Sequence, residues 1–148
     1  MILKLLNILL ADDDTDDCIF FKSALAELLL PTELTAVNDG EQLMDHLTNE
    51  TTVLPHVLFL DLNMPRKNGF ECLLEIKKNE KLNHIPVIIF STSFEKEVVN
   101  ELHNNGAHYF IRKPTQFSKI KEIIQESLLL IVQEDITQPT RENFVLTA

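Results

Sequence analysis

Acidic side chains follow two apolar stretches of the sequence, each at a point where a strand would end. Residues 5–11 run into Asp12 and Asp13, and residues 57–60 run into Asp61. A lone Asp at a strand end is usually a turn former, but the same arrangement twice in one chain indicates a shared carboxylate site. Carboxylates in one cleft raise one another's pKa unless a cation compensates. Oxygen ligands of this kind favour a hard divalent ion such as Mg2+, which readily takes a phosphate as a further ligand.

A hydroxyl group and an ammonium group follow two further apolar runs. Residues 87–90 are followed by Ser91, and residues 109–111 are followed closely by Lys113. Ser91 would supply a hydroxyl donor, and Lys113 a mobile cation able to pair with Asp61 or with phosphate oxygens. Each residue has an ordinary structural explanation when taken alone. Their joint occurrence at four strand ends predicts phosphoryl transfer to a carboxylate.

These side chains meet if the elements between them form a parallel sheet. Five strand patterns alternate with five helical patterns, which is typical of an α/β fold with helices on both faces of a doubly wound sheet. The expected strands are residues 5–11, 34–37, 57–60, 87–90 and 109–111, and the expected helices are 15–30, one after 38–40, one from about 70, one carrying 94–102, and 115–132. Of the two common doubly wound strand orders, 2-1-3-4-5 fits five strands. Strands 1 and 3 then flank the switch point, so the polar side chains converge beyond the carboxyl ends of the strands.

Composition limits the classes of protein that fit. The chain has 148 residues, of which 45% are hydrophobic, enough for one domain with a single core. Its formal charge of -10, from 23 acidic and 13 basic residues, argues against direct nucleic-acid binding, because that needs a basic surface. Cys18 and Cys72 are too few for a disulfide framework and are expected as free thiols. No apolar stretch reaches the roughly 20 residues that span a bilayer, so we expect a cytoplasmic protein without membrane contact.

Taken together, the motifs resemble the receiver domain of two-component response regulators, in its single-domain, chemotaxis-type form. The matching features are an acidic pair after strand 1, Asp-x-x-Met-Pro from Asp61 to Pro65, a Ser after strand 4 and Lys-Pro after strand 5. The resemblance covers about residues 5–132. It implies the flavodoxin-like receiver fold with five strands, and it leaves residues 133–148 as a tail without an output domain.

The resemblance implies that Asp61 is the phosphoacceptor of a Mg2+-dependent site. The implied metal ligands are Asp12, Asp13, Asp61 and the backbone carbonyl of Asn63. Asp14 makes the register of the acidic pair ambiguous, and we prefer the first two acids because the apolar run ends directly before them. Asp16 and Asp17 are expected in the first turn of the following helix, where carboxylates suit the helix dipole.

Three other residues take the switch and phosphate-binding positions of the family. By the resemblance, Ser91 is the switch hydroxyl, Lys113 binds the phosphoryl group, and the Lys113–Pro114 peptide bond is cis. Phe110 stands three residues before the lysine, at the aromatic switch position, where Tyr is frequent. A phenylalanine can still move between exposed and buried positions, but it offers no hydroxyl to a partner.

The resemblance also predicts partners. A sensor histidine kinase or a histidine phosphotransfer protein would donate the phosphoryl group, and a downstream protein target would bind the changed face of helix 4, strand 5 and helix 5. Residues 128–132 are five consecutive apolar residues, more than one buried stripe of a helix absorbs. Either a second copy of the chain or residues 144–146, folding back over a polar linker at 133–143, would cover them. We favour a phosphorylation-dependent homodimer, with the tail as a modifier.

A phosphatase, a pseudo-receiver scaffold and a histidine metal site are the alternatives to this interpretation. Phosphatases of the haloacid dehalogenase type also use an Asp nucleophile and Mg2+, but their strand-1 motif would place Thr or Val at Asp16, and a substrate cap has no room. A pseudo-receiver scaffold normally lacks the acceptor or the acids, and here all are present. We therefore expect a switch and not an enzyme. His103 and His108 stand on either side of Asn105-Gly106 and share no helical face, so they do not predict a metal site.

Overall fold

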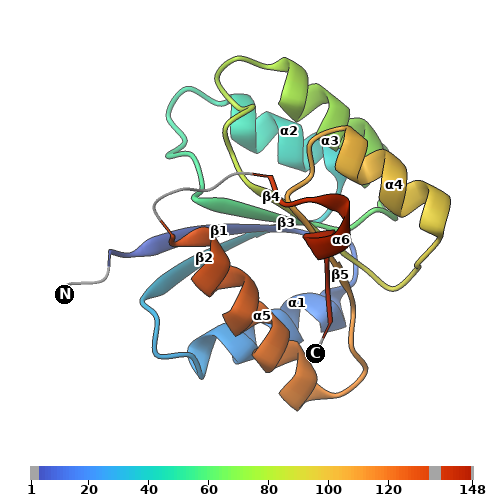
Figure 1. Cartoon of the computed structure of the whole chain (residues 1–148). Coiled ribbons are helices and arrows are strands. Elements are labelled where there is room, and N and C mark those ends of the chain that lie inside the picture. Colours follow the sequence, from blue (N-terminus) through green and yellow to red (C-terminus); the bar gives the residue numbers. More distant parts are fainter. Residues whose placement is uncertain (1–3, 134–137, 148) are drawn as a thin grey trace.

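A parallel sheet forms the centre of the computed structural model, which describes residues 4–133 and 138–147 (Figure 1). The strands are β1 (Leu6–Ala11), β2 (Thr32–Val37), β3 (Val57–Leu60), β4 (Val87–Ser91), β5 (Tyr109–Arg112) and β6 (Val145–Leu146). The helices are α1 (Thr15–Ala26), α2 (Gly40–Thr48), α3 (Gly69–Lys78), α4 (Lys96–Asn104), α5 (Phe117–Ile131) and α6 (Arg141–Phe144). In Figure 1, α1 and α5 cover one face of the sheet, and α2, α3 and α4 cover the other.

The strand order in the described residues is β2-β1-β3-β4-β5-β6, and neighbouring strands are parallel. This arrangement confirms the predicted α/β fold and the predicted strand order 2-1-3-4-5, and it adds a sixth strand. β6 pairs with the outer edge of β5, with Phe110 opposite Val145 and Ile111 opposite Leu146. The sheet therefore includes two residues from the segment that the sequence analysis placed outside it.

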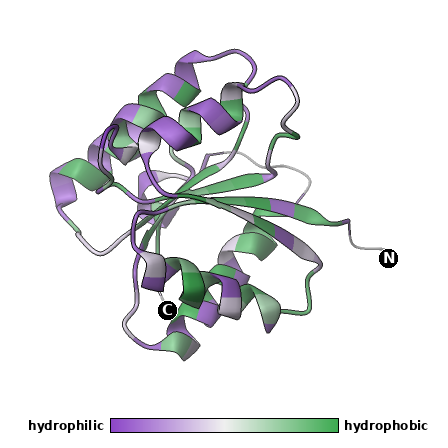
Figure 2. Ribbon diagram, turned by 180° about the vertical axis from the view of Figure 1, so that it is seen from behind, coloured by the Kyte–Doolittle hydropathy of each residue, from purple (hydrophilic) through white to green (hydrophobic). Residues whose placement is uncertain are grey.

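Each face of the sheet buries its own apolar cluster. β3 and β4 are buried along their whole length because both faces are covered, which explains why their sequences read as uninterrupted apolar runs. Between the sheet and α1, the ring of Phe21 packs edge-on against Phe59 and Phe90, with centroids 4.9 and 5.8 Å apart. Figure 2 shows hydrophobic residues along the central strands and a mixture of hydrophobic and hydrophilic residues on the covering helices. The packing fixes α1 against the two strands that lead to Asp61 and Ser91.

Local signals set the boundaries of α1 and α4. The Asp14 carboxylate accepts hydrogen bonds from the backbone N–H groups of Asp16 and Asp17 at 2.9 and 3.2 Å, so Asp14 caps α1. Gly106 has φ 96° and follows the end of α4, where a left-handed residue commonly ends a helix and glycine adopts that conformation without strain.

Two helices are shorter than predicted. α1 ends at Ala26 and residues 27–30 turn towards Pro31, because a proline disfavours helical backbone in the residue before it. Leu29 in this turn is 97% exposed. α5 begins at Phe117, two residues later than expected. None of the helices within the described ranges is long and apolar enough to cross a membrane.

The C-terminal segment packs onto α4 and β5. Phe144 is fully buried, and its ring centroid lies 5.1 Å from that of His103 and 6.5 Å from that of Phe110. The side-chain amide of Gln138 donates a hydrogen bond to the carbonyl of His103 at 2.6 Å, and the imidazole of His103 bonds the carbonyl of Pro139 at 2.8 Å. Hydrogen bonds to His103 thus hold the start of this segment, and the packing of Phe144 holds its end.

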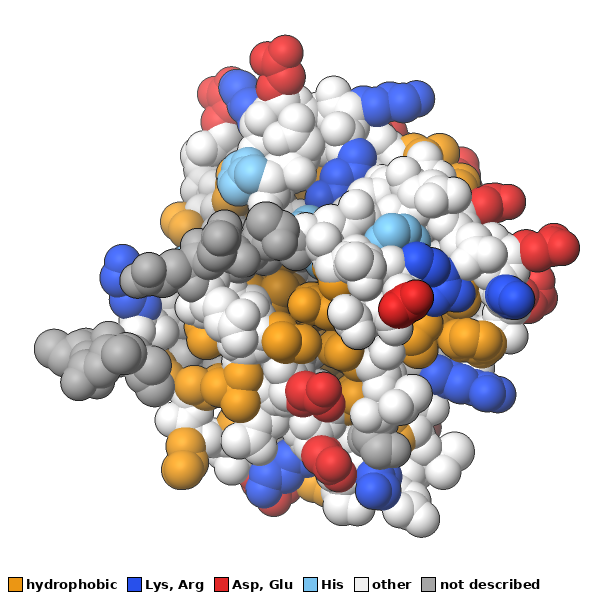
Figure 3. All heavy atoms as spheres, viewed as in Figure 1, with side chains coloured by type: hydrophobic (Ala, Val, Ile, Leu, Met, Phe, Trp, Pro, Cys, Tyr) orange, Lys and Arg blue, Asp and Glu red, His pale blue; other side chains and the backbone are white. Residues whose placement is uncertain are grey.

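The described part of the C-terminal segment, residues 138–147, therefore packs against α4 and the edge of the sheet. Residues 144–146 fold back, which was the alternative that the sequence analysis placed second; the polar linker expected at 133–143 lies partly outside the described residues. Leu129 and Val132 remain 47% and 40% exposed, so part of the apolar end of α5 stays uncovered. Figure 3 shows hydrophobic side chains at the surface on this side of the molecule.

The Lys113–Pro114 peptide bond is trans, as is every peptide bond in the described residues, so the predicted cis bond is wrong. The trans form is favoured by only about 0.5–1 kcal/mol before proline, and a motif alone does not decide between the two isomers.

Candidate functional site

The carboxyl ends of β1, β3, β4 and β5 bring together four of the residues predicted from sequence. Asp12 follows β1, Asp61 follows β3, Ser91 ends β4 and Lys113 follows β5. The backbone N–H of Asp61 donates to the carbonyl of Ala11 at 2.9 Å, and that of Lys113 donates to the carbonyl of Ser91 at 2.8 Å. Interstrand backbone hydrogen bonds thus continue past the strand ends and fix the relative positions of the functional side chains.

Three carboxylates meet at this edge. Asp12, Asp13 and Asp61 each offer an oxygen, and these oxygens lie within 4.8 Å of one another. Asp12 and Asp61 are buried, whereas Asp13 is exposed at the mouth of the site. Asp14 is not in this group, because its carboxylate is engaged in capping α1. The donor set fits a hard divalent cation, which prefers carboxylate oxygens and keeps open positions for water or phosphate.

The Lys113 ammonium is the centre of the charge arrangement. Its Nζ lies 2.8 Å from Oδ2 of Asp12, 2.8 Å from Oδ2 of Asp17 and 3.2 Å from Oδ2 of Asp61. An ammonium has three N–H donors, so these three contacts use its full hydrogen-bonding capacity. Its side chain is 7% exposed, and Nζ also lies 5.5 Å from the ring centroid of Phe90.

Asp17 is the site residue that the sequence analysis missed. The sequence predicts its place in the first turn of the helix, which the structure confirms, but it does not predict the contact of Asp17 with Lys113. The available signal was that α1 starts at the same edge of the sheet as Asp12, so its first turn faces the lysine after β5. A helix-start Asp has an ordinary explanation in the helix dipole, and that explanation concealed the contact.

Burial and charge set the protonation of the central pair. Burial raises the pKa of Asp12 to about 6, although hydrogen bonds from Lys113 and from the backbone N–H of Asp14 oppose the rise. Burial alone would lower the pKa of Lys113, but hydrogen bonds to Asp12 and Asp17 and the charge of Asp61 raise it above its usual value. Lys113 therefore remains a cation, and a further positive charge beside Asp12 would lower the pKa of that carboxyl again.

Ser91 and Phe110, the predicted switch residues, contact other side chains than the carboxylates. The Ser91 hydroxyl is buried, 3.2 Å from the hydroxyl of Ser93, and it accepts a hydrogen bond from the backbone N–H of Ser93 at 3.3 Å. The Phe110 ring is buried between Phe94, at a centroid distance of 5.7 Å, and the tail residue Phe144. The aromatic position is therefore in its inward orientation, and the C-terminal segment covers it.

The loop after β3 is held close to the start of α3. The backbone N–H of Asn63 donates to Oδ1 of Asp61 at 3.3 Å, and that of Gly69 donates to the carbonyl of Leu62 at 3.0 Å. A Cβ atom at Gly69 would lie 2.2 Å from the carbonyl oxygen of Asp61, so only glycine allows this approach. The position of Asp61 thus depends on a glycine eight residues later in the chain.

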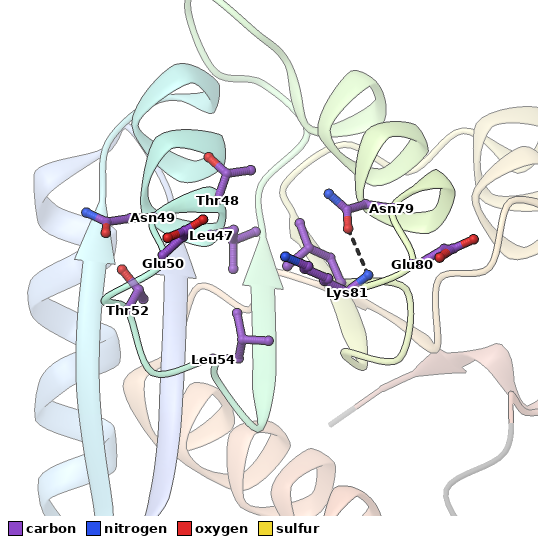
Figure 4. Close-up of a pocket in the computed structure, with 10 residues that line it drawn as sticks. Leu47, Thr48, Asn49, Glu50, Thr52, Leu54, Asn79, Glu80 and Lys81 are labelled. Atoms are coloured by element: carbon purple, nitrogen blue, oxygen red, sulfur yellow. Dashed lines mark hydrogen bonds between the residues drawn. The ribbon is translucent and has the colours of Figure 1, made fainter.

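A wide groove in the described residues lies away from this site. It has a volume of about 770 Å³ and lies between the segments that leave α2 and α3, lined among others by Asn49, Glu50, Asn79 and Lys81 (Figure 4). None of the predicted site residues lines it. A smaller groove of about 290 Å³, lined by Asn63, Ser93 and Phe110 among others, does border the carboxylate site. Position at the carboxyl ends of parallel strands locates the site better than groove size does.

Comparison with known proteins agrees with this geometry. The response regulator receiver domain family matches residues 8–125. Response regulator Rcp1 of Synechocystis is 30% identical over 138 residues, covering 89% of this chain and 92% of Rcp1. The probable methanogenesis regulatory protein FilR2 of Methanothrix harundinacea is 28% identical over 122 residues, covering 80% of this chain and 79% of FilR2.

Solved structures show the same relationship. The phosphorylated cyanobacterial phytochrome response regulator RcpA has a TM-score of 0.82 and 29% identity, covering 93% of this chain and all of RcpA (100%). The Mn2+-bound form of Rcp1 has a TM-score of 0.78 and 30% identity, covering 91% of this chain and 99% of Rcp1. The chain therefore belongs to the response regulator receiver domain family of two-component signalling.

Proposed function

We propose that this chain is a phosphoacceptor response regulator in which Asp61 receives a phosphoryl group from a phosphohistidine. The observation that carries the proposal is the position of the Lys113 ammonium, 3.2 Å from the Asp61 carboxylate, beside three carboxylates that can share one ion. Asp61 has a nucleophilic oxygen, and the site can neutralise the charge of an incoming phosphoryl group from two sides. The donor would be a sensor histidine kinase or a histidine phosphotransfer protein.

We propose Mg2+ as the cofactor. Asp12, Asp13 and Asp61 would hold the ion together with the backbone carbonyl of Asn63, and the Mn2+-bound structure of Rcp1 supports a divalent metal at such a site. When bound, the ion supplies charge neutralisation at the transferring phosphoryl oxygens.

The chemical step follows from the positions of Asp61 and Lys113. A carboxylate oxygen of Asp61 attacks phosphorus, an O–P bond forms, the N–P bond of the phosphohistidine breaks, and its electron pair returns to the donor nitrogen. Lys113, already hydrogen-bonded at Asp61, then pairs with a phosphoryl oxygen. Hydrolysis of the acyl phosphate restores the carboxylate and resets the switch.

We propose that Ser91 and Phe110 transmit the change to a protein-binding face. The Ser91 hydroxyl would give up its contact with the Ser93 hydroxyl and donate a hydrogen bond to a phosphoryl oxygen. The loop that connects β4 to α4 would then move with Ser91. Shifting a two-state equilibrium from 1:99 to 99:1 takes about 5.5 kcal/mol of differential interaction, which two charge-assisted contacts can supply. The face of α4, β5 and α5 would then bind a downstream protein target, or a second copy of the chain in a phosphorylation-dependent homodimer.

The net charge and the two thiols bear on the cellular location of the protein and on its partners. We propose a cytoplasmic protein that does not bind nucleic acid directly, in line with its net charge of -10. Cys18 and Cys72 are free, and burial raises the pKa of each thiol to about 11, so both remain protonated near neutral pH.

Transfer from a phosphohistidine donor tests the function. A purified histidine phosphotransfer domain carrying a radiolabelled phosphoryl group is mixed with the wild-type chain and with Asp61→Asn, in Mg2+ and in a chelator. We expect label on the wild-type chain only, and only with Mg2+. Sustained turnover of p-nitrophenyl phosphate without stoichiometric labelling would instead identify a phosphatase.

A further inference from the structure

Asp17 contributes a contact to Lys113 that the proposed reaction does not itself require. Its Oδ2 lies 2.8 Å from Nζ, as short as the contact made by Asp12 and shorter than the 3.2 Å to Asp61. The Asp17 side chain is 30% exposed, but the ammonium that it touches is almost fully buried. The contact is therefore held at the rim of the site, between α1 and the residue that follows β5.

Helix initiation does not explain this contact. Asp14 already caps α1, and Asp16 occupies the same first turn with an exposed side chain that makes no hydrogen bond or ion pair in the described residues. Both Asp16 and Asp17 suit the helix dipole equally. Only Asp17 reaches Lys113, so its role differs from that of its neighbour.

The other two partners of Lys113 have a second task. Asp12 and Asp61 belong to the carboxylate group that can hold a divalent ion, and Asp17 does not. If Asp12 and Asp61 held a divalent cation, and Asp61 became an acyl phosphate, the oxygens of both residues would be drawn away from the ammonium and both bonds would weaken. Asp17 is then the remaining carboxylate that keeps Lys113 in place.

We propose that Asp17 is a positioning residue, which holds the Lys113 ammonium beside Asp61 during phosphoryl transfer. The proposal rests on the proposed function for its kinetic consequence, but the Asp17–Lys113 contact exists in the unphosphorylated protein. Without Asp17, the ammonium would lose one of its three hydrogen-bond acceptors and would occupy the position beside Asp61 for less of the time.

The experiment compares the wild-type chain with Asp17→Ala, Asp17→Asn and Asp16→Ala. Asp16→Ala is the matched control, because it removes the same charge from the same helical turn without touching Lys113. Phosphorylation rates are measured with acetyl phosphate at saturating Mg2+, Mg2+ affinity by calorimetry, and the Lys113 ammonium by its 15Nζ resonance in the unphosphorylated protein. Circular dichroism establishes that each variant is folded.

For Asp17→Ala we expect phosphorylation about tenfold slower, the lower end of the effect of losing a hydrogen bond to a charged group. Its Mg2+ affinity should stay within about threefold of wild type, because Asp17 is not a ligand. Asp17→Asn, which keeps an acceptor oxygen, should recover part of the rate. The 15Nζ signal should shift or broaden by exchange in Asp17→Ala and stay unchanged in Asp16→Ala.

Equal rates and equal 15Nζ signals in Asp17→Ala and Asp16→Ala would overturn the proposal, as would faster phosphorylation of Asp17→Ala. If the wild-type chain itself takes no phosphoryl group, the proposed function fails. The 15Nζ comparison would still decide whether Asp17 positions Lys113, because it needs no phosphorylation.

Discussion

The Nζ atom of Lys113 lies 2.8 Å from Oδ2 of Asp12, and both side chains are buried although 101 residues separate them in the sequence. This pair joins β1 to β5 across the carboxyl edge of the sheet. It also leaves Asp12 with a pKa raised to about 6, because the lysine compensates only part of the cost of burial.

Mg2+ binding should weaken as the pH falls through the pKa of Asp12. Below about pH 6 a proton competes with the ion for this carboxylate, so the apparent dissociation constant should rise up to about tenfold per pH unit. Calorimetric titrations at about pH 7 and about pH 5.5 measure the effect. An affinity independent of pH over this range would mean that Asp12 is not a ligand.

The second acid of the pair gives a mutational test of the metal ligands. Asp13→Ala should lose most of the Mg2+ affinity, because Asp13 supplies one of three clustered carboxylates. Asp14→Ala should keep the affinity and instead lose about 1 kcal/mol of stability, the usual worth of a helix cap. Comparable losses of affinity in the two variants would shift the acidic pair by one residue.

His108 should make the fold sensitive to acid. Burial, and then the charge of Lys77, lowers the pKa of His108 from 6.5 to about 4. The unfolded chain therefore binds a proton at higher pH than the folded chain, and the stability contributed by the neutral imidazole is present above about pH 6.5 and lost as the pH falls towards 4.

Urea unfolding of the wild-type chain and of His108→Gln at about pH 7 and about pH 5 isolates this effect. Between these conditions the wild-type chain should lose about 2 kcal/mol more than the variant. Asp12 has its pKa raised and so acts in the opposite sense, but it is common to both proteins and cancels in the comparison. Parallel stability changes in the two proteins would contradict a partly buried His108 that stays neutral in the folded chain.

Phe144 should be the anchor of the C-terminal segment. Replacing this fully buried ring with Ala typically lowers stability by about 3–5 kcal/mol when the surrounding residues cannot fill the cavity. The short C-terminal segment has few other contacts that could keep it bound to the sheet after such a loss. Phe144→Ala should therefore release β6, and the amide protons of β5 and β6 should exchange faster with solvent. Leu129→Ala, at an exposed position, is the control and should leave exchange unchanged.

Self-association is tested by sedimentation of the full chain and of a chain ending at Gln133, each with and without beryllofluoride. We expect beryllofluoride to favour dimers of the full chain, because the proposed switch would alter the face of α4, β5 and α5. A full chain that stays monomeric throughout, while the shortened chain associates, would show that β6 replaces the second copy and that the homodimer proposal is wrong.

The sequence predicts most of the fold because burial leaves a direct trace in it. β3 and β4 read as unbroken apolar runs, since both of their faces are covered, and each run stops at a polar residue with a position in the site. β6 left no such trace: two residues cannot show the alternation of a strand, and their pairing depends on Phe144 filling space beside α4. The contact of Asp17 with Lys113 is likewise a property of how α1 packs on the sheet, so only the predicted topology, and no residue spacing, could have indicated it.

Asp61 is the residue that we propose as the phosphoacceptor. The most direct measurement is mass spectrometry of the wild-type chain and of Asp61→Asn after incubation with acetyl phosphate and Mg2+, with reductive trapping to locate the modified residue. One phosphoryl group on the wild-type chain, mapped to Asp61 and absent from Asp61→Asn, is the predicted result. A phosphoryl group retained by Asp61→Asn, or mapped to Asp12 or Asp13 in the wild-type chain, would contradict the account.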